Sequence, residues 1–162
     1  MPSNTAPPVS RRAPDLGVPD ALVQLSFLVQ QALAESAQAH DVPVQQARLL
    51  GVLRDREPGM AGLAALLELD KSSATGLVNR AARQGLVKRL IRPEDRRAVR
   101  VVLTDKGRRL AAEIGTEVER RLHALVDGLS ETNRKRLSRL ATQVVFAEAE
   151  RRGLDLTPDA AG

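Results

Sequence analysis

Residues 61–85 read AGLAALLELDKSSATGLVNRAARQG, and this stretch decides the fold of the chain. Its first part predicts a short helix at 61–67, followed by a three-residue turn that ends in Asp70. Asp70 is a good N-cap for a second helix at 71–84, and Gly85 suits the position after its end. Two helices joined by so short a turn form a helix-turn-helix. The first helix should bury Leu63, Leu66 and Leu67.

The helix at 71–84 has one apolar and one polar face. Helical spacing places an inward stripe at Ala74, Leu77, Val78 and Ala81. On the polar side, Asn can pair with adenine and Arg with guanine in a major groove, and the helix N-terminus offers N–H donors to phosphate. Gly76 either lets the helix approach its partner closely or is simply tolerated at a solvent position. The predicted DNA contacts of this helix are Lys71, Ser72, Ser73, Thr75, Gly76, Asn79 and Arg80.

A β-hairpin follows the second helix. Short strands are expected at 86–92 and 98–104, with the loop 93–97 between them. A narrow minor groove accepts an inserted arginine, and Asp95 would orient the guanidinium of Arg97. The predicted contacts of this wing and its strands are Lys88, Arg89, Arg92, Asp95, Arg96, Arg97 and Arg100. Of these, Lys88, Arg89, Arg92 and Arg100 should neutralise phosphates.

Longer helices flank this lobe. One is expected from Asp20 to about residue 40, and a second, after Pro43, at 44–56. Thr104 should cap a long helix to about residue 127, and Ser130 a last helix to about residue 152. The apolar stripes on the first and last two of these helices exceed what one small lobe needs, so they can bury each other across a two-fold axis.

The predicted fold class is therefore mainly α with a small β-hairpin, a winged helix-turn-helix whose N- and C-terminal helices form a dimerisation domain. A flexible arm is expected at 1–19, which holds five of the nine prolines, and a flexible tail at 153–162. Between them, 20–152 form one domain, with the winged helix-turn-helix at 43–104. Its dimerisation helices are expected at 20–42 and 105–152.

Positive charge gathers on the same lobe. The net charge is +5, but the segment from Lys71 to Arg109 holds 12 basic and three acidic residues, a net of +9. Such a patch attracts a polyanion, most commonly nucleic acid. Aromatic residues make up only 1% of the chain, which argues against the stacking platforms that bind single strands. No apolar run is long enough to span a membrane.

Neither an enzyme nor a metal protein is indicated. The chain has no Cys, Gly-x-Ser-x-Gly, phosphate loop or His-Glu-x-x-His motif, and no cofactor is expected. Its two histidines, His40 and His123, could form a metal or ligand site only with carboxylates such as Asp41 or Glu119 nearby. Histidines at such positions are usually structural or solvated, and the sequence leaves the question open.

Several runs resemble the MarR family of bacterial transcription regulators. They are Leu66 to Thr75, Gly85-Leu86-Val87, Pro93-Glu94-Asp95-Arg96-Arg97, and Leu103-Thr104-Asp105-Lys106-Gly107, and the likeness covers about residues 20–150. The resemblance implies a homodimer that reads a palindromic operator in double-stranded DNA. It also implies wing roles for Arg97 and Asp95, and helix contacts from Ser72, Ser73, Thr75, Asn79 and Arg80. The chain departs from the common pattern at Glu68, Gly76 and Asn79, where the family often has Gly, Arg and Asp.

The same resemblance implies a ligand-responsive repressor in the bacterial cytoplasm, associated with the nucleoid when bound. A small molecule of unknown identity would bind between the dimer helices and the reading lobe and release the operator. Its pocket should be lined by Leu, Val, Ala and Arg48, with at most Phe27 or Phe146 adding a ring. The alternative is a winged-helix module that binds protein without specific DNA binding, although such a module would not need the charge of +9.

Overall fold

The structure of the chain is a computed structural model that describes residues 14–92 and 95–157. Within these residues the elements follow in the order α1 (Gly17–Gln38), α2 (Val44–Asp55), α3 (Met60–Leu67), α4 (Lys71–Arg83), β1 (Val87–Arg92), β2 (Asp95–Leu103), α5 (Asp105–Val126) and α6 (Glu131–Arg152). The predicted class, mainly helical with one antiparallel hairpin and a winged helix-turn-helix, is confirmed.

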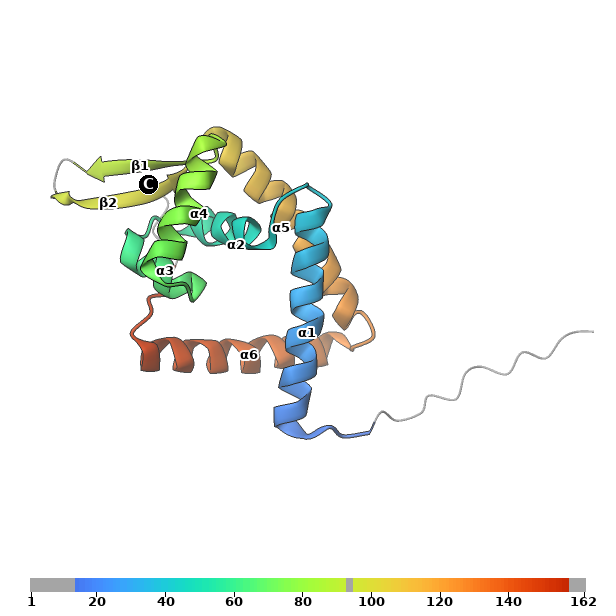
Figure 1. The fold of residues 1–162 in the computed structure, drawn as a ribbon. Helices are drawn as coiled ribbons and strands as arrows, with labels where there is room; N and C mark the ends of the chain where they lie inside the picture. Colours follow the sequence, from blue (N-terminus) through green and yellow to red (C-terminus); the bar gives the residue numbers. More distant parts are fainter. Residues whose placement is uncertain (1–13, 93–94, 158–162) are drawn as a thin grey trace, which may run out of the picture.

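Two groups of elements are visible in Figure 1. Helices α2, α3 and α4 gather beside the hairpin, which projects away from α1 and α5. Helix α5 packs against both α1 and α2 and so joins the groups. The core lies in the lobe, where Leu49, Leu50, Leu63 and Val78 are fully buried. Each such side chain stabilises the fold by about 1.5–3 kcal/mol relative to exposure.

Short-range caps set the ends of the helices as predicted. The Asp70 side chain accepts from the Ser73 N–H at 2.9 Å, and Thr104 Oγ1 accepts from the Gly107 N–H at 3.0 Å. Ser130 caps α6 in the same way, at 3.3 Å from the Asn133 nitrogen. Gly85 follows α4 with a φ of +70°, the left-handed conformation that glycine adopts without a Cβ penalty. These caps fix where α4 and α5 begin.

Helix α1 begins earlier than predicted, at Gly17 rather than Asp20. The carboxylate of Asp15 accepts from the Gly17 N–H at 2.9 Å, so it satisfies the first backbone donor of the helix. Pro19 fits in the first turn because its missing N–H would have no partner there. Only residues 14–19 of the expected arm are described, and they include this first turn.

The hairpin is longer than predicted at its second strand. β2 begins at Asp95, three residues before the expected start, and Arg92 pairs with Asp95. The register of the two strands shifts between Ile91 and Arg92. Apolar and polar residues alternate poorly in the first strand, so its sequence could not locate this shift. The tip residues 93–94 lie outside the described residues.

The C-terminal segment makes contacts beyond α6. Gly153 ends the helix with a φ of +64°, and Leu154 and Leu156 are half-buried. The Arg56 guanidinium donates to the Leu156 carbonyl, and Arg152 Nη1 donates to Glu68 Oε1 at 2.8 Å. The expected flexible tail at 153–162 is therefore held against the lobe over residues 153–157.

Candidate nucleic-acid interface

Helix α4 presents the two faces that its spacing predicts. Ala74, Leu77, Val78 and Ala81 are buried, with exposed fractions of 0–3%. Most of the opposite side is exposed, and Thr75, Gly76 and Asn79 are half-buried. The fully exposed predicted contacts are Lys71, Ser72, Ser73 and Arg80.

The hydroxyl groups at the start of α4 are already engaged. Ser72 Oγ donates to Asp70 Oδ1 at 2.7 Å, and Ser73 Oγ donates to Asp70 Oδ2 at 2.6 Å. These bonds, with the Ser73 hydroxyl bond the largest cause, hold the pKa of the Asp70 carboxyl well below its usual range. Thr75 Oγ1 donates to the Lys71 carbonyl at 2.8 Å. Each hydroxyl has one proton, so in this arrangement Ser72, Ser73 and Thr75 offer acceptor oxygens rather than donors to a ligand.

A hydrogen bond joins α4 to β1, the first strand of the hairpin. Arg89 Nη2 donates to Asn79 Oδ1 at 2.8 Å. We expected Arg89 to contact phosphate and Asn79 to contact a base. The structure brings the two side chains together, so the Asn79 oxygen is used as an acceptor and one Arg89 N–H as a donor. We name the surface formed by Lys71, Ser72, Ser73, Gly76, Asn79, Arg80 and Arg89 the reading surface. Lys88 precedes Arg89 in β1, so its side chain points to the opposite face of the hairpin, and its contact with phosphate stays a prediction.

Gly76 is not required by close packing against the described residues. A Cβ built there would lie 3.4 Å from Arg80 Nη1, an ordinary contact with the end of a flexible side chain, so both sequence explanations of this glycine stay open. A shallow cleft of about 320 Å³ opens beside it, lined in part by Gln45, Leu69 and Ser73. Gln45 comes from the first turn of α2 and was not among the predicted contacts. Nothing in its local sequence pointed to it, because only the packing of α2 against α4 brings it here.

Arg100 has a structural partner at the base of the wing. Its Nη1 donates to the Glu57 carbonyl at 2.9 Å, and the Val101 N–H donates to the Pro58 carbonyl at 3.1 Å. These bonds tie β2 to the connection between α2 and α3. Contact of Arg100 with phosphate stays a prediction. The side chains of Arg92, Asp95, Arg96 and Arg97 lie outside what the structure describes, so the predicted bond between Asp95 and Arg97 stays a prediction too.

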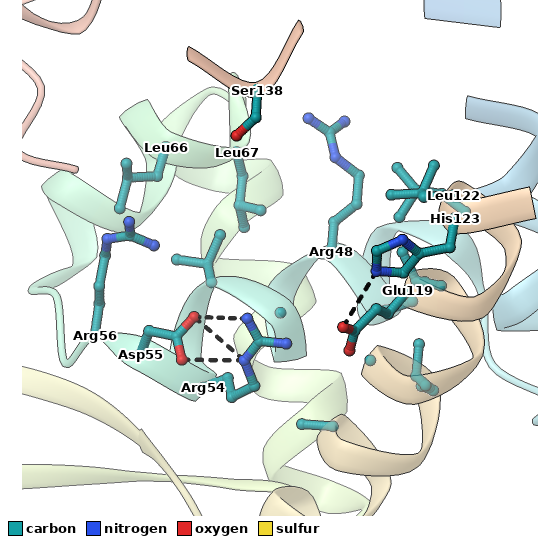
Figure 2. A pocket seen from close by; sticks show the side chains of 18 of the residues that line it. Arg48, Arg54, Asp55, Arg56, Leu66, Leu67, Glu119, Leu122, His123 and Ser138 are labelled. Atoms are coloured by element: carbon teal, nitrogen blue, oxygen red, sulfur yellow. Dashed lines mark hydrogen bonds and ion pairs between the residues drawn. The ribbon is translucent and has the colours of Figure 1, made fainter. Parts of the chain in front are cut away.

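A cavity of about 1030 Å³ lies on the other side of the lobe, between α2, α3, α5 and α6 (Figure 2). Leucine, valine, isoleucine and alanine form most of its wall, together with the predicted Arg48. Neither Phe27 nor Phe146 lines it. Arg54 and Asp55 form a bidentate pair at 2.8–3.2 Å, which lowers the pKa of Asp55 through the hydrogen bonds from Arg54.

The two histidines lie in different pairs. His40 Nδ1 is 3.8 Å from Glu113 Oε2, and His123 Nε2 is 3.5 Å from Glu119 Oε1. In the described part of the chain, no three His, Cys, Asp or Glu side chains gather in a way that could hold a metal ion. Among those same residues, no helix has the length and apolar composition needed to cross a membrane.

Comparisons with known proteins agree with this geometry. Residues 40–98, which include α2, α3, α4, β1 and the start of β2, match the model of the MarR family. No curated protein sequence matches the chain.

Similar solved structures cover most of the chain. RV1404 from Mycobacterium tuberculosis is 29% identical with a TM-score of 0.66, over 88% of this chain and 95% of that one. CouR from Rhodococcus jostii RHA1, bound to p-coumaroyl-CoA, is 24% identical with a TM-score of 0.69, over 83% and 96%. Wild-type apo MarR from E. coli is 22% identical with a TM-score of 0.67, over 81% and 98%.

Proposed function

We propose that the chain, whose residues 40–98 match the model of the MarR family, is a member of that family and a homodimeric, sequence-specific DNA-binding repressor that responds to a small molecule. Helix α4 would enter the major groove, and the tip of the hairpin would enter the adjacent minor groove. Such a regulator would be located in the cytoplasm and would associate with the nucleoid when it binds DNA. No catalytic role is proposed.

The reading surface is the observation that carries this proposal. A capped helix N-terminus, an exposed Arg80 and the Asn79–Arg89 bond support the proposal that this side of the lobe reads bases and binds phosphates. Asn79 and Arg80 have the chemistry for base edges, while Lys71, Lys88 and Arg89 supply charge for phosphates. The wing residues Arg92, Asp95, Arg96 and Arg97, with Arg100 at its base, extend the proposal along the hairpin.

The exposed apolar faces of α1 and α6 support a dimer. Only Ala149 of α6 is buried in the single chain. Many exposed apolar side chains on two helices favour an interaction site, and a second copy of the chain offers the same side chains for a two-fold contact. The exposed side chains are Leu22, Val23, Leu25, Phe27 and Leu28 on α1, with Leu137, Leu140, Val144, Val145 and Phe146 on α6. The dimerisation helices proposed from the sequence, 20–42 and 105–152, contain all of them.

The cavity supports the proposed response to a small molecule. Its walls come from the lobe through α2 and α3, and from the flanking helices through α1, α5 and α6. A ligand that fits only one relative position of these groups would change the separation of the two recognition helices. DNA binding needs that separation near one helical repeat, about 34 Å, so such a ligand would release the operator.

Binding to duplex DNA tests the proposal. The chain should bind the palindrome upstream of its own gene, and affinity should fall by about 10³–10⁵ between 50 mM and 200 mM salt if 6–10 phosphates are contacted. Arg80→Ala should weaken operator binding by about tenfold or more. Arg136→Ala removes the same charge from α6 and should leave affinity unchanged. The alternative, a winged-helix module that binds protein, predicts no salt-sensitive DNA binding.

A further inference from the structure

Six charged or titratable side chains line the cavity between the lobe and α5, within the described residues: Arg48, Arg54, Asp55, Arg56, Glu119 and His123. Most of them already have a partner. Arg54 and Asp55 are paired with each other, and His123 lies beside Glu119. These two pairs leave Arg48 and Arg56 as the cations not matched by a carboxylate of the cavity.

Arg56 is partly committed elsewhere. Its Nη2 donates to the Leu156 carbonyl of the C-terminal segment. Its Nε is buried and has no hydrogen-bond partner among the described residues, so one donor remains unsatisfied at the cavity wall. Arg56 therefore adds positive potential to the cavity while its position is set by the tail.

Arg48 is the cation left free. It is half-buried on α2, and no hydrogen bond or ion pair of its guanidinium is found in the described part of the chain. Figure 2 shows this guanidinium extending toward Ser138 of α6, away from the Arg54–Asp55 pair and from His123. A guanidinium in such a mostly apolar setting favours an anion that accepts two of its N–H groups.

The rest of the wall is aliphatic. Leu33, Val52, Leu66, Ile114, Val118 and Leu122 line it, and no Phe, Tyr or Trp does, while the imidazole of His123 lies beside Glu119. Ring-shaped ligands gain part of their affinity from stacking and edge contacts with Phe, Tyr and Trp, which line no part of this cavity. A flexible alkyl chain gains its affinity from buried area alone, which an aliphatic wall supplies fully.

We infer that this cavity binds a straight-chain aliphatic carboxylate, with the carboxylate on Arg48 and the alkyl chain along the leucine, valine and isoleucine wall. The inference rests on the proposed function, since it names the chemical class of the effector. It does not depend on DNA binding, because the contacts lie in a cavity away from the reading surface.

Calorimetric titration of the intact protein, without DNA, tests this inference. Octanoate should bind at least about tenfold more tightly than octan-1-ol, which keeps the chain but loses the charge-assisted hydrogen bonds. Decanoate should bind about tenfold more tightly than octanoate, because two further methylene groups are buried. Benzoate should bind more weakly than octanoate. Equal affinity for octanoate and octan-1-ol, tighter binding of benzoate, or no binding of any alkanoate would each overturn the inference.

Variants of Arg48 test where the carboxylate group of the ligand binds. Arg48→Met keeps the apolar stem and should weaken decanoate binding at least about tenfold, with octan-1-ol unaffected. Arg136→Met, on α6 outside the cavity, is the matched control and should bind decanoate as the natural chain does. Circular dichroism and light scattering show whether Arg48→Met is folded and in the natural oligomeric state. If that variant misfolds, Arg48→Gln replaces it, and unchanged decanoate affinity in the folded variant contradicts the inference.

The failure of this inference can be told apart from a failure of the proposed function. Operator binding in the absence of any alkanoate tests only the reading surface. If DNA binds with the expected salt dependence while no alkanoate binds, the effector class is wrong and the regulator stands. If decanoate binds to the predicted site but DNA does not bind, the effector class stands and the proposed regulator function is wrong.

Discussion

At the scale of single residues, close packing explains why the run from Leu103 to Gly107 ends in a glycine. A Cβ at this position would lie 1.9 Å from the Leu86 carbonyl oxygen and 2.9 Å from its carbon. The same carbonyl accepts the Thr104 N–H at 3.0 Å, so the backbone before β1 lies directly on the first turn of α5. Only a residue without a side chain fits this contact, which locks the long helix onto the lobe.

Gly107→Ala should therefore destabilise the chain by about 3 kcal/mol or more, because two backbone segments must separate. Gly51→Ala is the matched control, since nothing lies within 4 Å of a Cβ there. Its helical position should make that variant more stable by up to about 1 kcal/mol. Urea denaturation measures both free energies of unfolding. Equal stability of Gly107→Ala and the natural chain would contradict the close contact.

The sequence predicts residues that act on their near neighbours. Asp70, Thr104 and Ser130 each cap a helix through an N–H three residues on, and a side chain at that spacing has few other partners. The Asn79–Arg89 bond and the Arg152–Glu68 pair join residues 10 and 84 positions apart. Such pairs depend on how helices and strands pack, so neither could be predicted. The exception among the long-range features is Arg48, which was expected in the pocket and does line it.

At the scale of the elements, a charge network ties α5 to α1. Glu117 accepts from Arg120 at 2.7 Å and 2.9 Å and from Arg121 Nε at 2.7 Å, and Arg121 also pairs with Glu35 of α1. These bonds, with that to Arg120 the largest cause, lower the pKa of Glu117 to about 2. The network thus stabilises the junction between the predicted dimerisation helices while Glu117 is ionised.

Glu117→Gln should lower stability at neutral pH and have a smaller effect in acid. The folded-state pKa lies below the ordinary value of 4.5, so the unfolded chain binds the proton first as pH falls. The stabilisation is fully present above about pH 4.5 and is lost as pH falls toward about 2. Urea midpoints of the two proteins across this range should converge. A difference that stays constant with pH would show that the ion pairs contribute nothing.

The C-terminal segment is a second link between elements. Through Arg56 and Arg152 it joins the end of α6 to the α2–α3 connection and to Glu68, which holds a left-handed φ of +54° in the helix-turn-helix turn. The departure from Gly at this position therefore costs strain, and the bond from Arg152 supports it.

Removal of residues 153–162 should loosen the connection between α2 and α3. Hydrogen–deuterium exchange should become faster in the amides of residues 56–60, because the Arg56 and Leu156 contact is lost. Exchange in the middle of α5 serves as the internal control and should not change. If the connection exchanges at the same rate with and without the segment, the contact does not hold the lobe.

At the scale of the whole molecule, apolar side chains are buried unevenly along the single chain. Its lobe has a dense core, whereas α6 buries only Ala149 and leaves an apolar face open. The sequence predicted the fold class and this surplus of apolar surface, since both follow from periodicity. The arrangement of a dimer depends on two copies and stays a proposal.

Val144→Asp should break the proposed dimer, because it places a charge at the centre of the apolar face of α6. We expect the dimer dissociation constant to rise at least about tenfold, with operator affinity falling in parallel. Thr132→Asp, in the first turn of the same helix beside Lys135 and Arg136, should leave both unchanged. Light scattering over a concentration series measures the dimer dissociation constant. An intact dimer in Val144→Asp would place the interface elsewhere.

The central claim is that the reading surface of a two-fold dimer binds a palindromic operator. Footprinting on the interval upstream of the gene tests it most directly, with the natural chain and Arg97→Ala compared across a salt series. We predict two protected half-sites about 10–10.5 base pairs apart, strong loss of protection with salt, and much weaker protection by Arg97→Ala with the dimer intact. No protected palindrome, or protection that neither salt nor Arg97→Ala changes, would contradict the account.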